Sequence, residues 1–311
     1  MPGINAGMTR PPPSASRPLP VIINSGGGTA RRLGDKLAEQ VNAAFAETGR
    51  EIDLRLVEGK DLAAAITNAV GQTVAVGGGD GTISTAASIL SDQQRRLAVL
   101  PLGTLNHFAH DIGLDGTLEQ AAVVAAGDHS RHVDLGVAGN RVFINNASLG
   151  LYARMVRDRD RRPLPKWLAT IPAAFGVWLR PDARAVRITV DGRPRIIRTP
   201  LLFFGNNRYS LASGHLGQRG YLEDGLLSLY ALAERGSLGL VLSGARIMAG
   251  RPDPHSDFAA LEDAREVVVS GQGSHHVAMD GEVVKLGFPL RISIRPGALE
   301  VMVPAGEIRS A

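Results

Sequence analysis

Short apolar or alternating runs recur along the first 130 residues, and a stretch with helical spacing follows each of them. The runs have the length of strands that are buried in a parallel sheet. They lie at 20–24, 52–56, 73–76 and 97–100. Strands that alternate with crossovers of this length predict an α/β domain with a parallel sheet.

Helices are expected between these strands because apolar residues return every four positions or because a capping residue opens the segment. The repeat from Leu33 to Phe45 predicts a helix over 30–48 that ends at Gly49. Thr117 opens another helix in a capping box with Gln120. This helix is expected over 117–126, and two others are predicted at 62–70 and 82–90.

The pattern changes near residue 130, where alternation with a period of two becomes dominant. Asp191-Gly192 separates two such runs and predicts a β-hairpin. A helix is expected around 237–249. Strands are predicted at 133–137, 142–146, 187–190, 195–199, 201–205, 226–232, 265–270, 275–279 and 290–294. This half is therefore expected to be a mainly antiparallel β-sandwich.

Length and composition fit a cytoplasmic protein of two domains. The 311 residues exceed the usual size of one domain. Residues 1–18 are rich in Pro and Ser and are expected to form a disordered tail. The absence of cysteine excludes disulfides, thiolate metal sites and cysteine nucleophiles. A net charge of +4 suits nucleotides or acidic membranes as partners. No nucleic-acid partner is expected.

Glycine-rich loops follow three of the predicted strands, at 25–29, 77–84 and 101–106. Glycine lets the backbone approach a ligand, and N–H groups at a helix N-terminus bind phosphate oxygens. Carboxyl ends of strands are also where open α/β sheets bind ligands. Asp80 inside such a loop would repel phosphate unless a cation joined them. The residues therefore indicate nucleotide phosphate with Mg²⁺, whereas an ordinary strand-to-helix turn is the alternative for any one loop.

Two of these loops, GGDGT at 78–82 and PLGTLN at 101–106, resemble the catalytic domain of the diacylglycerol kinase family, which includes sphingosine, ceramide and bacterial lipid kinases. They are more distantly similar to NAD kinase and phosphofructokinase. Walker-type, dinucleotide-binding, metalloprotease and serine-hydrolase motifs are absent. The resemblance implies an α/β nucleotide-binding domain at 19–130, a β-rich lipid-substrate domain at 131–294, and a segment at 295–311 that returns to the first domain.

The resemblance also implies which residues bind ATP. They are Asn24, Ser25, Gly26, Gly27, Gly28, Gly78, Gly79, Asp80, Gly81, Thr82, Ile83, Ser84, Thr104 and Asn106. Thr104 and Asn106 have a second interpretation, because Thr and Asn often cap helices. The chain departs from the family at Ser84, where many relatives have Asn, and at His107, where an Asp is common.

Asp280 and Glu282 lie in a segment that matches the one holding the proposed general base of the family, so they join Asp80 as candidate catalytic residues. A carboxylate with a pKa of about 4 is a weak base at neutral pH. It suffices in a loose transition state, where the proton leaves late. The sequence leaves open which of the two takes the proton and which contacts metal, and a DGE string is also typical of a hairpin turn.

A structural Mg²⁺ is implied by the resemblance at 221–227, where Asp224 supplies the side chain and Tyr221 and Leu226 supply carbonyl groups. Oxygen ligands of this kind suit Mg²⁺. A plain turn is the alternative. The segment 143–150 also matches the family near its interdomain site, although its Asn145, Asn146 and Ser148 could instead satisfy buried backbone groups.

Six cations between Arg154 and Lys166 precede an apolar segment, 167–179, that contains both tryptophans of the chain. Such a segment either lies in a membrane interface or packs on its own domain. We therefore expect a cytoplasmic lipid kinase, peripheral at the inner face of the membrane, that phosphorylates diacylglycerol, ceramide or a related lipid with ATP and Mg²⁺. The alternatives are a kinase of a soluble acceptor and a nucleotide-binding regulator without turnover. The oligomeric state, including a homodimer, is left open.

Overall fold

The computed structural model describes residues 17–114, 116–150, 184–209, 219, 221–233, 239, 242, 243, 246, 253 and 257–306. The tail at 1–16 and the basic, tryptophan-bearing segment at 154–179 lie outside the described residues, as does most of the helix expected at 237–249. Among the described residues, no helix is both long and apolar enough to cross a bilayer.

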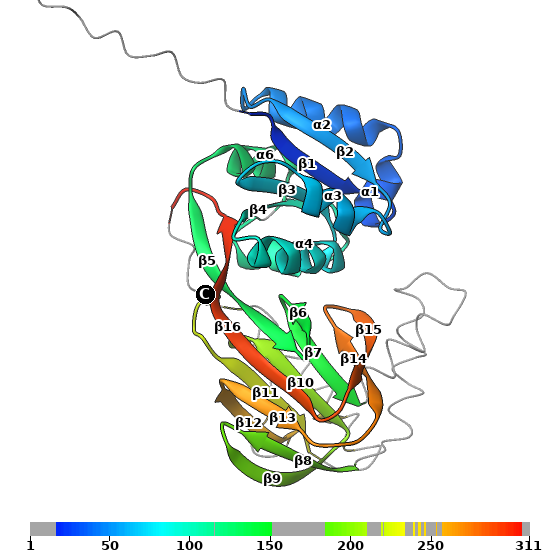
Figure 1. The fold of residues 1–311 in the computed structure, drawn as a ribbon, viewed down its shortest axis with the longest axis vertical. Helices are drawn as coiled ribbons and strands as arrows, with labels where there is room; N and C mark the ends of the chain where they lie inside the picture. Colours follow the sequence, from blue (N-terminus) through cyan, green and yellow to red (C-terminus); the bar gives the residue numbers. More distant parts are fainter. Residues whose placement is uncertain are drawn as a thin grey trace, which may run out of the picture.

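The first part of the chain forms a parallel sheet with helices on both faces, and we call residues 19–129 the α/β part (Figure 1). Its strand order is β2-β1-β3-β4, with every neighbouring pair parallel. The strands are β1 (Leu19–Asn24), β2 (Ile52–Val57), β3 (Thr73–Gly78) and β4 (Arg96–Pro101). The helices are α1 (Gly28–Leu33), α2 (Lys36–Ala46), α3 (Leu62–Asn68), α4 (Asp80–Asp92), α5 (His107–Asp111) and α6 (Leu118–Ala126).

Alternate strand residues enter two separate cores. Ile22 and Val76 pack with α3, α4 and α5 on one face of the sheet, whereas Val21 and Ile23 pack with α2 and α6 on the other. Burial of both faces explains why these strands are almost wholly apolar. Thr117 caps α6 as predicted, because its hydroxyl accepts the Gln120 N–H at 3.2 Å.

Two long strands, β5 (Ser130–Ala138) and β16 (Leu290–Met302), continue this sheet into the second part of the molecule (Figure 1). They pair antiparallel with each other along most of their length. The end of β16 also pairs parallel with β4, through Val301 and Leu97, so the last strand returns to the first sheet. The boundaries expected at 130 and 294 therefore fall inside strands that both parts share.

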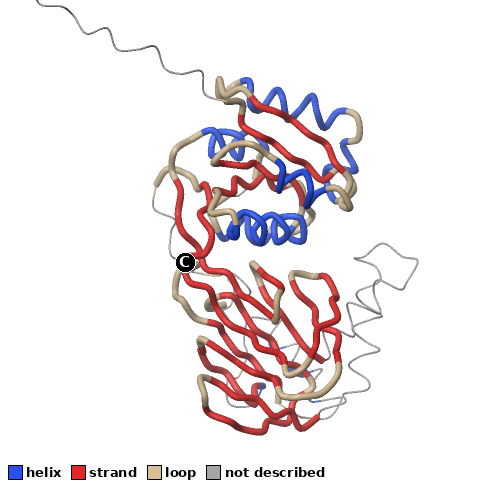
Figure 2. Tube along the Cα trace, viewed as in Figure 1, coloured by secondary structure: helices blue, strands red, loops and turns tan. Residues whose placement is uncertain are grey.

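The second part is a sandwich of two antiparallel layers, drawn almost entirely as strand in Figure 2. One layer continues the ten-stranded sheet with β6 (Arg141–Phe143), β8 (Arg184–Val190), β9 (Arg193–Thr199) and β13 (Glu266–Val269). The other is a six-stranded sheet of β7 (Asn146–Gly150), β10 (Leu201–Asn206), β11 (Leu227–Leu232), β12 (Phe258–Ala264), β14 (Ser274–Met279) and β15 (Glu282–Gly287). Phe143 and Ile292 from the first layer share a core with Phe204 and Val277 from the second. The predicted fold class is confirmed.

Local differences from the prediction have local causes. The helix expected at 30–48 is broken into α1 and α2 at Gly34, which adopts a φ of 53°. The strand expected at 142–146 is interrupted by a turn between β6 and β7, where backbone N–H groups bind a distant carboxylate. Asp191 and Gly192 form the predicted hairpin turn, with φ of 44° and 80°. Strands β12 and β15 were not predicted.

Candidate functional site

The three glycine loops converge at the carboxyl ends of β1, β3 and β4. A β-carbon on Gly103 would lie 2.4 Å from the Cα of Gly79, so the second and third loops touch through backbone alone. A β-carbon on Gly28 would lie 2.7 Å from the Leu102 carbonyl oxygen, and Gly28 has a φ of 55°. Only glycine fits such contacts, so the loops are packed together in a way that other residues would prevent.

Polar side chains of the predicted nucleotide residues hold these loops in place. The Asn24 amide donates to the Thr82 hydroxyl at 3.0 Å and accepts the Gly26 N–H at 3.0 Å. Asn106 adopts a left-handed φ of 53°, and its side chain accepts the Gly103 N–H at 2.8 Å. Asn106 is therefore at the N-cap position of α5, but its side chain closes its own loop and does not cap the helix.

Other predicted loop residues divide into exposed and buried ones. Gly26, Gly27, Gly28 and Thr104 are exposed at the rim of the loops. Ser25 donates its hydroxyl to the Val57 carbonyl at 3.1 Å. Ile83 belongs to the hydrophobic core, so its side chain does not face the loops. Gly78 leaves room for Thr82, because a β-carbon there would lie 2.6 Å from the threonine side chain.

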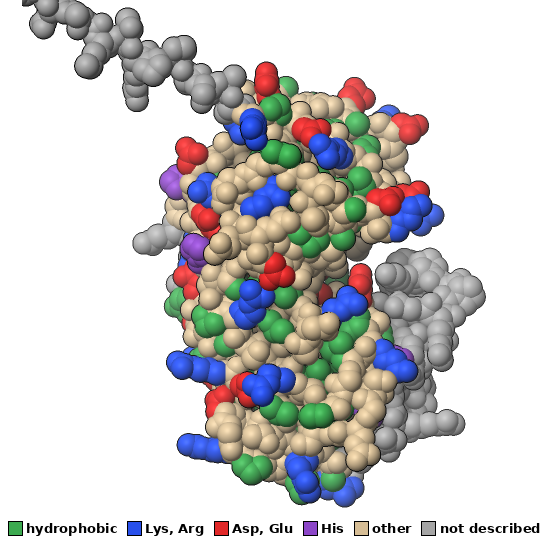
Figure 3. Space-filling view, viewed as in Figure 1, with side chains coloured by type: hydrophobic (Ala, Val, Ile, Leu, Met, Phe, Trp, Pro, Cys, Tyr) green, Lys and Arg blue, Asp and Glu red, His purple; other side chains and the backbone are tan. Residues whose placement is uncertain are grey.

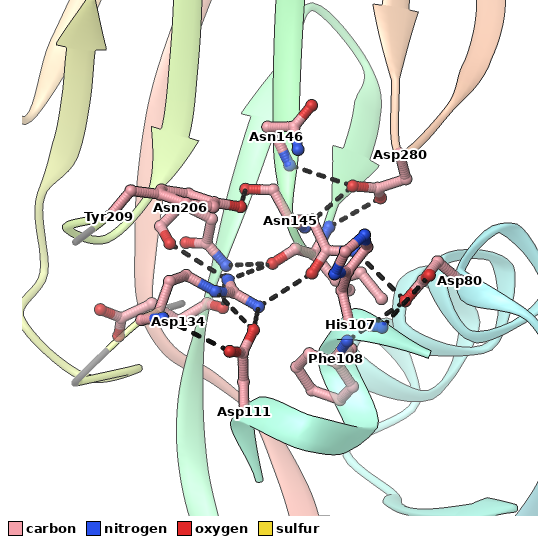
Figure 4. A network of polar contacts seen from close by, with 12 residues as sticks. Asp80, His107, Phe108, Asp111, Asp134, Asn145, Asn146, Asn206, Tyr209 and Asp280 are labelled. Atoms are coloured by element: carbon pink, nitrogen blue, oxygen red, sulfur yellow. Dashed lines mark hydrogen bonds and ion pairs between the residues drawn. The ribbon is translucent and has the colours of Figure 1, made fainter. Parts of the chain in front are cut away.

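Asp80 links the second loop to α5 and to the sandwich (Figure 4). Its carboxylate accepts the backbone N–H groups of His107 at 3.3 Å and Phe108 at 3.2 Å. It also accepts the side-chain amide of Asn145 at 3.4 Å. A carboxylate at the N-terminus of a helix is stabilised by these donors and by the helix dipole. Asp80 therefore has a structural role in addition to the cation contact predicted for it.

Asp280 is buried at the turn between β14 and β15, where it has a φ of 46° and is 9% exposed. Its carboxylate accepts three consecutive backbone N–H groups, from Ile144 at 2.9 Å, Asn145 at 2.8 Å and Asn146 at 3.1 Å. The Ser84 side chain of α4, together with these N–H groups, favours the ionised form of Asp280. Burial raises the pKa of the Asp280 carboxyl above its ordinary value, although these donors oppose the shift.

Glu282 differs from Asp280 in the exposure of its side chain and in the residues that its carboxylate approaches. Its side chain is exposed, and its Oε1 atom lies 2.7 Å from the position that a β-carbon on Gly81 would occupy. Gly81 is in the first turn of α4, so Glu282 brings a carboxylate from the sandwich to the glycine loop. Of the two carboxylates that the sequence could not rank, Asp280 is held by backbone groups and Glu282 faces the loops.

The turn at 221–226 contains the residues predicted to hold a structural Mg²⁺. Asp224 and Tyr221 are exposed, and the Leu226 carbonyl already accepts the Asn207 N–H at 3.0 Å. Asp134, which the sequence did not indicate, accepts the Gly225 N–H at 2.7 Å and fixes the turn to β5. The part of the chain that the structure describes holds no cluster of three or more His, Cys, Asp or Glu side chains suited to a metal. An ion at Asp224 would need backbone carbonyls, and this site stays a prediction.

Arg219 is a further buried residue that the sequence analysis missed. Its side chain is fully buried and forms an ion pair at 2.6 Å with Asp111, at the end of α5. Tyr209 contacts its guanidinium and donates a hydrogen bond to the Asn145 carbonyl at 2.9 Å. Burial raises the pKa of Tyr209 to about 12, so the phenol is neutral at physiological pH. No sequence motif marks the Arg219–Asp111 pair, since its members are 108 residues apart.

Comparison with known proteins identifies the family of the chain. Residues 18–138 match the family model of the diacylglycerol kinase catalytic domain. The chain is 30% identical over 284 residues to a probable lipid kinase YegS-like from Pseudomonas aeruginosa (strain UCBPP-PA14), covering 86% of this chain and 91% of the relative. It belongs to the diacylglycerol kinase family. A probable lipid kinase YegS-like from Pseudomonas savastanoi pv. phaseolicola is 31% identical over 283 residues, covering 86% and 90%.

Solved structures support the fold of this lipid kinase family member. A putative diacylglycerol kinase from Bacillus anthracis str. Sterne superposes with a TM-score of 0.72 and 19% identity, covering 93% of this chain and 95% of that one. Another structure of a putative diacylglycerol kinase from the same organism gives a TM-score of 0.70 and 21% identity, covering 92% and 97%. The glycine loops and the Asp280–Glu282 turn thus belong to a phosphotransferase of the lipid kinase family.

Proposed function

We propose that this protein transfers the γ-phosphate of ATP to a lipid hydroxyl, with diacylglycerol as the first candidate and ceramide or another long-chain alcohol next. The observation that carries the proposal is the approach of Glu282, from the sandwich, to Gly81 in the glycine loop of the α/β part. Phosphoryl transfer to an alcohol needs a site that positions the phosphates and a group that accepts the hydroxyl proton, and the glycine loops and Glu282 supply these two parts.

The loops supply the nucleotide site in this proposal. The first backbone N–H groups of α4, a helix of 13 residues that begins at Asp80 in the second loop, have no partner within the helix and favour phosphate oxygens. The close contact of Gly79 with Gly103 keeps side chains out of the space that phosphate oxygens would occupy. The three loops of the α/β part therefore fit a triphosphate, with Asn24 and Asn106 holding the loops in shape.

The carboxylate of Asp80, in the second glycine loop, is the group that would hold Mg²⁺ beside the phosphates, since hard oxygen ligands suit this ion. When bound, Mg²⁺ neutralises the charge that develops on the transferred group. Of the two turn carboxylates, we assign the role of proton acceptor to Glu282. Both oxygens of Asp280 already accept backbone hydrogen bonds, whereas the Glu282 carboxylate is exposed.

The lipid is proposed to be reached at a membrane surface by a peripheral protein. One support for this proposal is that the chain belongs to a family of lipid kinases. The other is the set of cations and tryptophans in the segment at 154–179, which lies outside the described residues. On the face drawn in Figure 3, Lys and Arg side chains are scattered in separate groups and form no broad basic patch. The membrane contact is therefore assigned to that segment and not to this face.

The experiment that tests the function is incubation of pure protein with ATP labelled at the γ-phosphate, Mg²⁺ and a total lipid extract. Label should move into the organic phase, and mass spectrometry of the labelled species should identify a phosphorylated lipid alcohol. A matched reaction without Mg²⁺ should transfer none. Label that stays in a water-soluble product would support a soluble acceptor, and no transfer to any acceptor would contradict the kinase assignment.

A further inference from the structure

Arg219 and Asp111 form a buried ion pair between the sandwich and the α/β part. The Arg219 Nε and Nη2 atoms donate to Asp111 at 2.8 Å and 2.6 Å, and the two side chains are 0% and 9% exposed. Removing one partner of a buried pair leaves the other charge without compensation. An ion pair in this position therefore fixes α5 against the sandwich.

The short helix α5 is held at both ends by residues of other elements. Asp80 of α4 accepts its first N–H groups, and Arg219 binds its last residue, Asp111. Asn145 connects Asp80 and Arg219, because its side-chain NH2 group donates to Asp80 at 3.4 Å and its side-chain oxygen accepts from Arg219 at 2.9 Å. These contacts form a closed ring from α4 through α5 and Arg219 to Asn145 and back to α4 (Figure 4).

The same arginine also holds the turn at 144–146. Its Nη1 atom donates to the carbonyl oxygens of Ile144 at 2.6 Å and Asn206 at 3.1 Å. On the other side of that turn, the N–H groups of residues 144–146 bind Asp280. The turn is thus clamped between a guanidinium and a carboxylate, and the carboxylate belongs to the hairpin that carries Glu282.

We infer that Arg219 is a positioning residue for phosphoryl transfer, which acts by setting the approach of Glu282 to the first turn of α4. This inference rests on the proposed function. Arg219 fixes the turn at 144–146, the turn fixes Asp280, and Asp280 fixes the β14–β15 hairpin. Through Asp111 and α5 it fixes Asp80 and α4 as well. Its loss should lower kcat more than it weakens nucleotide binding, because the glycine loops are packed through other contacts.

Arg219→Lys is the most informative substitution. Lysine keeps the charge and can pair with Asp111, but a single ammonium cannot also bind Asn145 and the Ile144 carbonyl in the geometry of a guanidinium. Displacements of about 1 Å can lower a rate by on the order of 10²-fold. We expect kcat to fall by about 10- to 100-fold, the range for residues that orient a catalytic group, with the KM for ATP within about 3-fold of wild type. The melting temperature should also fall, because buried oxygen acceptors lose a donor.

A second variant, Asp111→Leu with Arg219→Met, removes the pair without leaving a buried charge and should show the same loss of kcat. Arg246→Met with Asp257→Leu is the matched control, because this pair also has a fully buried carboxylate but contacts none of the ring residues. The control should change stability and leave kcat near wild type. Equal losses in the control and the Arg219 variants would show a general effect of stability and overturn the inference.

A double-mutant cycle with Glu282→Gln tests the route of the effect. If Arg219 acts by placing Glu282, Arg219→Lys should cost little further activity once Glu282 is replaced, whereas independent losses would multiply. Multiplying losses would overturn the inference. Hydrogen exchange supplies a readout besides activity, and the amides of 144–146 should exchange faster in Arg219→Lys. If wild type and the control variant both lack kinase activity, the proposed function is wrong. If both are active and Arg219→Lys has the kinetics and amide exchange of wild type, only this inference is wrong.

Discussion

Glu282 Oε1 lies 2.7 Å from the position that a β-carbon would take on Gly81, which brings the β14–β15 hairpin of the sandwich to the first turn of α4. The two residues are far apart in sequence and come from different layers of the molecule. This approach places an exposed carboxylate beside a phosphate-type loop. It is the relationship on which the proposed chemistry depends.

Gly81→Ala should separate activity from stability. Alanine favours a helix over glycine by up to about 1 kcal/mol, so the variant should be as stable as wild type or more so. Its methyl group would nevertheless displace the Glu282 carboxylate, and we expect kcat to fall on the order of 10²-fold. Steady-state kinetics measures the predicted loss of kcat, and thermal unfolding measures the predicted stability. Normal kcat in Gly81→Ala would mean that the Glu282 carboxylate need not lie at the loop.

Gly103→Ala is the contrasting variant in the same loops. Its β-carbon would lie 2.4 Å from the Cα of Gly79, and this backbone cannot move away as a flexible side chain can. Overpacking of this kind typically costs about 1–3 kcal/mol. We expect a lower midpoint in urea unfolding together with weaker ATP binding. A variant with unchanged stability would show that the loops are not packed as tightly as the structure has them.

Asp80→Ala should lower both Mg²⁺-dependent turnover and stability. The carboxylate binds the first N–H groups of α5, and loss of such a cap costs about 0.5–2 kcal/mol. The variant should still fold, with most of its kinase activity gone at every Mg²⁺ concentration. Circular dichroism and a Mg²⁺ titration of activity give the two measurements. A folded variant with near-normal activity would exclude Asp80 from the reaction.

Asp280 should make stability depend on pH in a particular direction. Burial raises the pKa of its carboxyl in the folded protein, so the folded state binds this proton more tightly than the unfolded chain does. The stabilisation is then full below the unfolded pKa of about 3.9 and is lost as pH rises through the folded pKa. The free energy of unfolding of wild type minus that of Asp280→Asn should therefore decline as pH rises above about 4. A difference that grows with pH would show that the three backbone donors dominate and that the pKa is lowered.

The membrane prediction rests on the sequence, because Trp167 and Trp178 lie outside the described residues. Binding to vesicles should rise with anionic lipid content and fall with salt, since screening shortens the Debye length to about 3 Å at 1 M. Replacing both tryptophans by alanine should weaken flotation with vesicles while ATP binding is preserved. Wild-type protein that stays unbound at low salt would favour a soluble acceptor.

Local sequence signals predicted the elements and the loops well, because periodicity and glycine placement act over a few residues. The Thr117 cap and the Asp191-Gly192 hairpin were predicted on that basis. The strand expected to end at 294 continues as β16 to Met302, since Pro296 lies where the pairing of β16 with β5 shifts register. Proline in a run normally argues against a strand, and here the irregularity accommodates it.

The orientation of the site residues could not be predicted in the same way. Asp280 binds N–H groups about 135 residues away, as its contact with Asn145 shows, and the local string DGE carries no sign of that partner. Arg219 and Asp111 are similarly remote. The sequence therefore indicated Asp280 and Glu282 as a pair, and only the three-dimensional contacts distinguish the buried, hydrogen-bonded carboxylate from the exposed one.

The most direct test of the central claim compares wild type with Glu282→Gln in transfer of labelled γ-phosphate from ATP to lipid. Wild type should place label in the organic phase, and the variant should lower kcat by roughly 10²–10⁴-fold, the usual value of a general base, while the KM for ATP stays within a few-fold. Thermal unfolding should show both proteins equally folded. Absence of labelled lipid with wild type, or a kcat for Glu282→Gln equal to that of wild type, would contradict the account.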